Sequence, residues 1–178
     1  MEIGLPRDCI LMTYSAEQSM PTQAPDDPIV VLLVDDQTIV HESVRALLRE
    51  HPEIELHTVR DPTKAINKAN SVHPTVILQD LNMPQVDGLT LIRFFRANPT
   101  TTQVPLIVLS SQEEPKIKAS AFALGANDYL IKLPDAVELV ARIKHHSRAY
   151  NNSRQRQRAE RELAAAKKRP RRPAAPKA

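Results

Sequence analysis

This 178-residue sequence has few of the residues that cross-link a small protein or carry it into a membrane. Its one cysteine, Cys9, has no second thiol for a disulfide and no neighbouring ligands for a metal cluster, which fits a reducing compartment. No apolar stretch approaches the roughly 18–20 residues that span a bilayer. The N-terminus carries Glu2 and Asp8 and lacks a small-residue cleavage pattern, so it makes a poor signal peptide. We therefore expect a cytoplasmic protein without membrane contact.

Aromatic residues are also scarce, with three Phe, three Tyr and no Trp, so aliphatic side chains must build the core. The chain length fits one domain with tails. Residues 151–178 carry ten basic and two acidic side chains, a net charge of +8, whereas residues 1–150 carry −5. We predict a disordered leader over 1–27, in which Met12 or Met20 could be the true start. A folded domain over 28–150 and a disordered, basic Pro/Ala-rich tail over 151–178 would follow.

Short continuous apolar runs alternate with segments of helical spacing along the folded part. Such runs are typical of strands buried on both faces of a parallel sheet. Asp61-Pro62 and Asp87 are expected to begin helices, and Gly125 to end one. The pattern predicts an α/β fold with five strand–helix units and right-handed crossovers. The expected strands cover 29–34, 53–59, 75–79, 105–109 and 128–132, and the expected helices cover 38–50, 62–71, 88–97, 114–124 and 136–150.

Polar residues stand where four of these strands end. Asp35 and Asp36 follow the first strand and Asp80 the third, while Ser110 and Lys132 close the fourth and fifth. Ligand sites in such sheets form outside the carboxyl ends of the strands, so these side chains are expected to converge. Crowded carboxylates suit Mg²⁺, which prefers oxygen ligands. A carboxylate can then accept a phosphoryl group while an ammonium and a hydroxyl bind its oxygens.

The residues that carry this chemistry resemble the receiver domain of two-component response regulators, over about residues 28–148. The matching segments are Leu33 to Asp36, Gln79 to Pro84 with Asp87-Gly88, Val108 to Ser110, and Gly125 to Lys132. The resemblance implies a flavodoxin-like (βα)5 doubly wound sheet in a single domain. It also implies a signalling switch that takes its phosphoryl group from a histidine kinase and acts through altered protein–protein contacts, without an output enzyme in this chain.

The same resemblance assigns individual roles. Asp80 would be the phosphoacceptor, with Mg²⁺ held by Asp35, Asp36, Asp80 and the backbone carbonyl of Asn82. Ser110 and Lys132 would bind the phosphoryl group, and Ser110 with Tyr129 would form the switch. Asn82 and Gln112 would tune autodephosphorylation. The fourth helix, fifth strand and fifth helix would present the face for a downstream target or a receiver homodimer.

One departure concerns the residue after Lys132, where most receivers have a proline and this chain has Leu133. The segments 106–115 and 132–143 look like receivers fused to diguanylate cyclases of surface-sensing chemotaxis-like pathways. The cyclase signature Gly-Gly-Asp/Glu-Glu-Phe is absent, and the residues after Tyr150 are too few for that domain. The resemblance therefore carries over phosphoacceptance and not cyclase activity.

Other interpretations stay open at this point. A truncated diguanylate cyclase is one, and an aspartate-nucleophile phosphohydrolase of the haloacid dehalogenase type is another. The second would use Asp35 as nucleophile, but its Asp-x-Asp motif is broken by Gln37. Nucleic acid could be attracted only by the basic tail. His41 and the His145-His146 pair are interpreted as helix-surface residues, and Tyr129 by itself as a tyrosine at the edge of the core.

Overall fold

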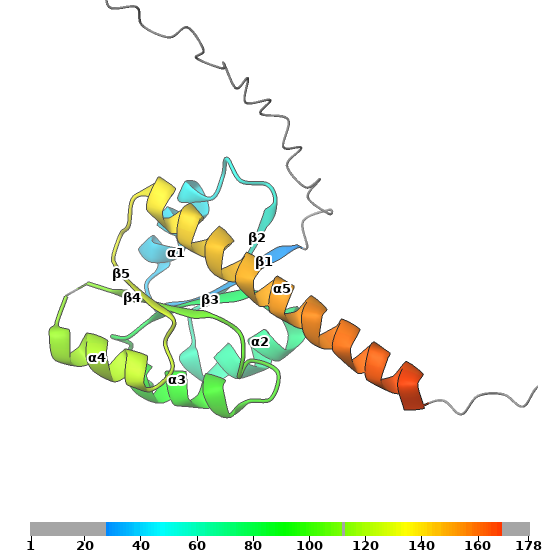
Figure 1. Ribbon diagram of the computed structural model, residues 1–178. Coiled ribbons are helices and arrows are strands. Elements are labelled where there is room, and N and C mark those ends of the chain that lie inside the picture. The colour runs from blue at the N-terminus through cyan, green and yellow to red at the C-terminus, as the bar shows by residue number, and fades with distance from the viewer. Residues whose placement is uncertain (1–27, 112, 169–178) are drawn as a thin grey trace, which may run out of the picture.

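The computed structural model describes residues 28–111 and 113–168 as a parallel sheet covered by helices on both faces (Figure 1). The leader predicted for 1–27 and the last ten residues of the predicted tail lie outside the described residues. The five-stranded sheet has the order β2-β1-β3-β4-β5, and every pair is parallel. The strands are β1 (Ile29–Val34), β2 (Ile54–Val59), β3 (Val76–Asp80), β4 (Leu106–Ser110) and β5 (Asp128–Ile131). This arrangement confirms the doubly wound, flavodoxin-like fold.

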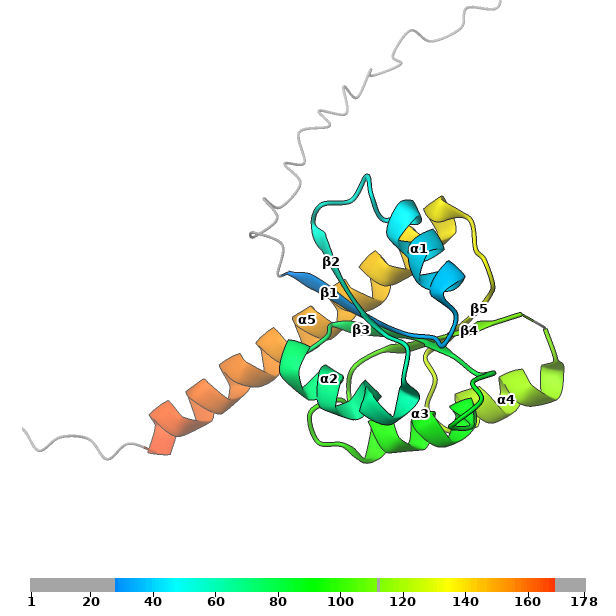
Figure 2. The ribbon, with the colours of Figure 1, turned by 180° about the vertical axis from the view of Figure 1, so that it is seen from behind.

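Helices cover the two faces of the sheet unequally, as Figures 1 and 2 show. Two helices lie on one face, α1 (Thr38–Leu47) and α5 (Ala136–Lys168). The other face carries the 3-10 turn Pro62–Lys64 with α2 (Ala65–Val72), α3 (Gly88–Ala97) and α4 (Pro115–Ala123). Each face has its own apolar core, since β1, β3 and β4 are buried along their whole length. Burial on both faces explains why these strands are continuous apolar runs.

Local signals begin and end the helices as the sequence predicts. The Asp87 carboxylate accepts a hydrogen bond from the backbone N–H of Thr90 at 2.9 Å and caps α3. Asp61 accepts from the backbone N–H of Thr63 at 3.0 Å and begins the turn before α2. Gly125 follows α4 with a φ of +106°, a conformation that side chains rarely adopt. These residues fix the entry and exit of the helices that flank the strand ends.

The fifth helix differs from its prediction, because it continues past Tyr150 to Lys168. The disordered tail expected from residue 151 is therefore helical over 151–168. No buried stripe runs through this stretch, and the prediction relied on that stripe alone. Ala, Arg, Gln, Glu and Lys dominate the stretch, and all of them have high intrinsic helix propensity. Among residues 28–111 and 113–168, no helix combines the length and apolarity needed to cross a membrane.

Candidate functional site

Three carboxylates meet at the edge of the sheet where the strands end. Asp35 and Asp36 follow β1, and Asp80 is the last residue of β3, which pairs with β1. One carboxylate oxygen from each lies within 4.8 Å of the others. Asp35 and Asp80 are fully buried, and Asp36 is half-buried. The convergence predicted from the strand ends is therefore present, with negative charge concentrated where water is largely excluded.

Lys132 lies against two of these carboxylates. It follows β5, and its Nζ is 2.7 Å from Oδ2 of Asp35 and 2.8 Å from Oδ2 of Asp80. Burial lowers the pKa of Lys132, but the hydrogen bonds and charges of the two aspartates outweigh it and raise the pKa above its usual value. Leu133 takes the place of the usual proline, and the Lys132–Leu133 peptide is cis. The ammonium thus reaches both carboxylates with leucine at this position.

Backbone N–H groups hold the other oxygens of the same two aspartates. Oδ1 of Asp35 accepts from the N–H of Gln37 at 2.9 Å, and Oδ1 of Asp80 accepts from the N–H of Asn82 at 3.1 Å. Burial raises the pKa of Asp35, an effect that Lys132 and the Gln37 N–H only partly counter and to which the Asp80 charge adds. Each carboxylate is thereby fixed by one backbone bond and one bond to the ammonium.

Asp36 supplies the test of whether a cation fits this cluster. Its Oδ1 is buried, and no residue in the described part of the chain gives it a hydrogen bond. An unpaired buried carboxylate oxygen is costly, and one ammonium cannot balance three negative charges. A divalent cation would supply the missing charge and partner, and carboxylate oxygens are the ligands that Mg²⁺ prefers. The donor set therefore fits Mg²⁺.

The remaining predicted residues lie around this cluster. Ser110 ends β4 and is buried, and its backbone carbonyl accepts from the N–H of Lys132 at 2.7 Å. Tyr129 is buried within β5, and Nζ of Lys118 lies 5.4 Å from the centre of its ring. Asn82 is exposed in the loop after β3. Gln112 lies outside the described residues.

Two histidines differ from their interpretation as surface residues. His41 is buried on α1, and its Nε2 lies 2.7 Å from the backbone oxygen of Asp35. His146 lies 3.0 Å from Oδ2 of Asp128, with its side chain only 17% exposed. His41 falls three residues before Val44, which is also buried, so helical spacing could have placed it on the inner face. His145 is exposed, as expected.

Comparisons with known proteins agree with this geometry. The response regulator receiver domain family matches residues 31–144. A protein-glutamate methylesterase/protein-glutamine glutaminase from Carboxydothermus hydrogenoformans is 40% identical over 62% of this chain and 31% of its own length. The transcriptional regulatory protein PrrA of Mycobacterium leprae is 36% identical over 64% of this chain and 48% of its own. The chain thus spans less than half the length of these curated relatives.

Solved structures give the same result. Chemotaxis protein CheY4 of Vibrio cholerae superimposes with a TM-score of 0.62 and 26% identity, over 67% of this chain and 98% of its own. The signal receiver domain of an HD domain-containing protein from Pseudomonas fluorescens superimposes with a TM-score of 0.68 and 25% identity, over 77% of this chain and 99% of its own. The Mn²⁺-bound form of response regulator Rcp1 superimposes with a TM-score of 0.56 and 26% identity, over 66% of this chain and 91% of its own. This chain belongs to the response regulator receiver domain family of two-component signalling.

Proposed function

We propose that this receiver accepts a phosphoryl group on Asp80 from the phosphohistidine of a histidine kinase. The observation that carries the proposal is the position of Lys132, whose ammonium contacts both Asp80 and Asp35 in a buried cluster of three carboxylates. Phosphoryl transfer requires alignment and neutralisation of charge more than covalent help from the protein. A carboxylate beside a fixed ammonium at the open end of a parallel sheet meets both requirements.

The chemistry assigned to Asp80 is nucleophilic. A carboxylate oxygen of Asp80 forms a bond to phosphorus while the phosphorus–nitrogen bond of the phosphohistidine breaks, and the imidazole nitrogen keeps the electron pair and takes up a proton. Lys132 would then turn from the free carboxylate to the phosphoryl oxygens. The buried hydroxyl of Ser110, at the end of the neighbouring strand, would donate to another phosphoryl oxygen.

The metal assignment rests on the same residues. Asp35, Asp36, Asp80 and the backbone carbonyl of Asn82 would hold Mg²⁺, which when bound supplies positive charge to the carboxylates and the phosphoryl oxygens. The buried, unpartnered Oδ1 of Asp36 among the described residues supports this assignment. The solved relative Rcp1, which binds Mn²⁺ in its crystal structure, supports it further.

The conformational response is assigned to Ser110 and Tyr129. Movement of Ser110 toward the phosphoryl group would change the space beside Tyr129, because β4 and β5 are paired in the sheet. Phosphorylation would then shift an equilibrium between two arrangements of this side chain. Asn82 and Gln112 are proposed to tune the lifetime of the phosphorylated state, and the receiver itself is proposed to cover residues 28–150.

The output surface is assigned to α4, β5 and α5. Each of these elements exposes apolar side chains, with Phe122 exposed to 43%, Ile131 to 48% and Val137 to 78%. β5 is also an edge strand of the sheet. Exposed apolar groups on neighbouring elements are a common feature of protein–protein contact sites. A downstream protein or a second receiver would bind here when Asp80 is phosphorylated.

The proposal is tested by incubating the protein with Mg²⁺ and acetyl phosphate and measuring its intact mass beside Asp80→Asn. We expect a phosphoryl adduct on the wild type only, stable in acid and labile in base, and lost when EDTA replaces Mg²⁺. Asp87→Asn is the matched control, because Asp87 caps α3 outside the cluster. An adduct on Asp80→Asn at the wild-type rate would refute the assignment.

A second candidate is that this receiver is one part of a longer signalling protein, for example a diguanylate cyclase. The course of α5 supports it, since the helix continues past the end of the family match at residue 144 as far as Lys168. The greater length of the curated relatives supports it as well. Reading the DNA downstream for a cyclase segment in another frame tests this candidate.

A further inference from the structure

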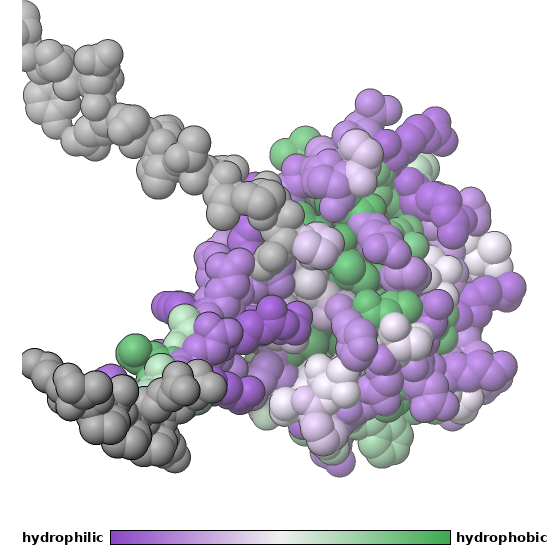
Figure 3. Space-filling view, turned by 90° about the vertical axis from the view of Figure 1, so that its right-hand side faces the viewer, coloured by the Kyte–Doolittle hydropathy of each residue, from purple (hydrophilic) through white to green (hydrophobic). Residues whose placement is uncertain are grey.

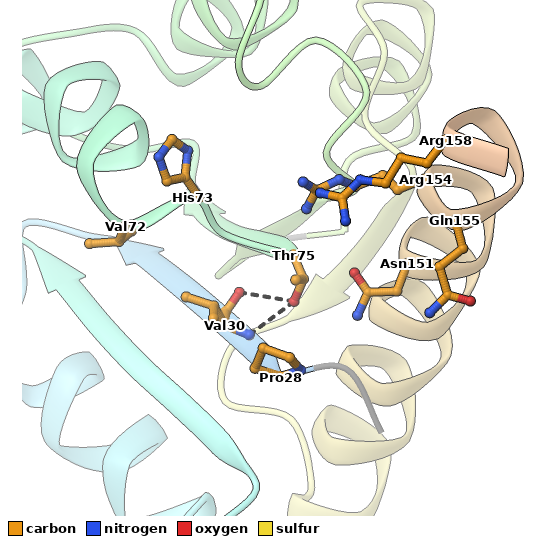
Figure 4. Close-up of a pocket in the computed structure, with 9 residues that line it drawn as sticks. All are labelled: Pro28, Val30, Val72, His73, Thr75, Asn151, Arg154, Gln155 and Arg158. Carbon is orange, nitrogen blue, oxygen red and sulfur yellow. Dashed lines mark hydrogen bonds between the residues drawn. The ribbon is translucent and has the colours of Figure 1, made fainter. Parts of the chain in front are cut away.

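A second polar site lies at the opposite edge of the sheet, where the strands begin. The extended part of α5 crosses this edge, and Figure 3 shows that the surface there is mainly hydrophilic. A pocket of about 340 Å³ lies between α5 and the first residues of β1 and β3 (Figure 4). Its walls include Asn151, Arg154 and Arg158 from α5, and His73 and Thr75 from the segment that enters β3. None of these residues belongs to the carboxylate cluster.

Two arginines give the pocket its charge. Arg154 and Arg158 are four residues apart, so they lie on the same side of α5, and both side chains extend toward the pocket (Figure 4). No acidic residue is among those that line it. Across residues 28–111 and 113–168, neither guanidinium has a carboxylate partner, and Arg154 only packs over the ring of Tyr150 at 5.5 Å. Two neighbouring cations that have no counter-charge among the described residues create a positive potential that attracts an anion.

Asn151 is an independent observation that points to a ligand. Its side chain projects from α5 toward Thr75, yet the residue is only 9% exposed. No hydrogen bond joins its amide to another described residue, and the amide nitrogen and oxygen are not fully buried, so they open onto the pocket. Thr75 cannot serve as its partner, because its hydroxyl is engaged by the backbone of Val30 and by the Ser147 hydroxyl. The Asn151 amide therefore has donor capacity beside the two arginines.

His73 forms the wall across from the arginines. It follows α2 with a φ of 49°, in the left-handed region that usually selects glycine at the end of a helix. The residue is exposed and is part of the pocket lining. A residue kept in a conformation that glycine would adopt more easily suggests a role for its side chain. The imidazole adds a third nitrogen donor group to the guanidiniums and the amide.

We propose that this pocket binds the phosphate group of a small molecule, either as free phosphate or as a phosphomonoester. A phosphate dianion matches two guanidiniums in charge, and its oxygens match the paired N–H groups of arginine in geometry. The Asn151 amide would donate to a further oxygen. The volume is at the lower end of the range for small-molecule sites, which favours a small phosphate compound over a polymer. The site would work independently of phosphorylation on Asp80.

The test is a titration followed by NMR, using inorganic phosphate and, separately, glucose 6-phosphate, in EDTA so that the carboxylate cluster holds no metal. Saturable 1:1 shifts are expected at the Asn151 side-chain amide, and the tighter ligand identifies free phosphate or monoester as the source. Replacing both arginines, Arg154→Gln with Arg158→Gln, should weaken binding at least tenfold, since two charge-assisted contacts are lost. Arg156→Gln is the matched control, because Arg156 lies on the same helix and does not line the pocket.

A second variant separates binding from folding. His73→Gly should leave thermal stability unchanged or higher, because glycine adopts positive φ without steric strain, while phosphate binding weakens. Absence of saturable shifts with both ligands would overturn the proposal. Equal weakening by Arg156→Gln would also overturn it, since it would indicate diffuse attraction to a basic helix. A short single-stranded DNA would also overturn the proposal if it fully displaced phosphate, as read at the Asn151 amide, and if Arg156→Gln weakened DNA binding as much as the double variant does.

Discussion

Replacing Lys132 with methionine should strongly destabilise the protein when no divalent cation is present. Methionine keeps most of the side-chain length and removes the charge that lies 2.7 Å from Asp35 and 2.8 Å from Asp80. The side chains of all three residues are at most 9% exposed, so water cannot easily replace the ammonium. The variant would leave the carboxylate cluster without a neutralising partner in the absence of metal.

The size of the effect follows from these distances. At an effective dielectric constant of about 20, each contact is worth about 6 kcal/mol of attraction. The cost of burying the ammonium offsets much of this sum, and loss of one partner from a buried pair typically costs about 3–5 kcal/mol. We expect the free energy of unfolding of Lys132→Met to fall by about 3–5 kcal/mol in EDTA. Mg²⁺ held by the three carboxylates would supply positive charge to the cluster, so its addition should recover much of the loss.

Urea denaturation of the wild type and Lys132→Met, each in EDTA and in Mg²⁺, measures this difference. Lys118→Met serves as the control, since Lys118 pairs with Glu113 outside the cluster. The pKa of Lys132 is raised, so its contribution should be fully present below pH 10.5 and be lost only as the pH rises through the higher folded value. Equal stability of Lys132→Met and the wild type in EDTA would refute the reasoning.

Three further predictions concern the third carboxylate of the cluster and two other parts of the fold. Asp36→Asn should reduce the gain in melting temperature on adding Mg²⁺, as differential scanning fluorimetry would show, because the buried Oδ1 of Asp36 lacks a partner among the described residues. Gly88→Ala should lower stability by about 1–3 kcal/mol in urea and slow phosphorylation, because a methyl group there would lie 2.4 Å from Cα of Leu81. The hydrogen bond from Lys144 lowers the pKa of Glu53 to about 2, so Glu53 stabilises the fold above pH 4.5 and loses that effect as the pH falls toward 2. Thermal unfolding of Glu53→Gln should lack that part of the pH dependence.

The strands were the most predictable part of the molecule. Every strand boundary predicted from the sequence lies within one residue of the structure, because buried parallel strands are continuous apolar runs that end at polar residues. The carboxylate cluster followed from the same rule, since parallel strands bring their carboxyl ends to one edge. Asp35, Asp36, Asp80 and Lys132 could therefore be placed together from their positions alone.

The parts that escaped prediction depend on contacts between distant segments or on helix propensity without burial. The C-terminal half of α5 has no apolar stripe, so periodicity gave no signal there, and only the propensities of its residues favoured a helix. His41 contacts a backbone oxygen in the turn after β1, a contact that spacing on a helix does not reveal. The proposed phosphate pocket requires Asn151 and His73 to line one cavity, which depends on where the extended helix crosses the sheet.

The most direct test of the central claim locates the phosphoryl group on the chain. The protein is phosphorylated with acetyl phosphate and Mg²⁺, the acyl phosphate is reduced with borohydride, and the position of the resulting homoserine is read by tandem mass spectrometry. Our account predicts homoserine at position 80 and none at Asp35 or Asp36. Homoserine in place of Asp35 would contradict it and favour a phosphohydrolase with its nucleophile after β1.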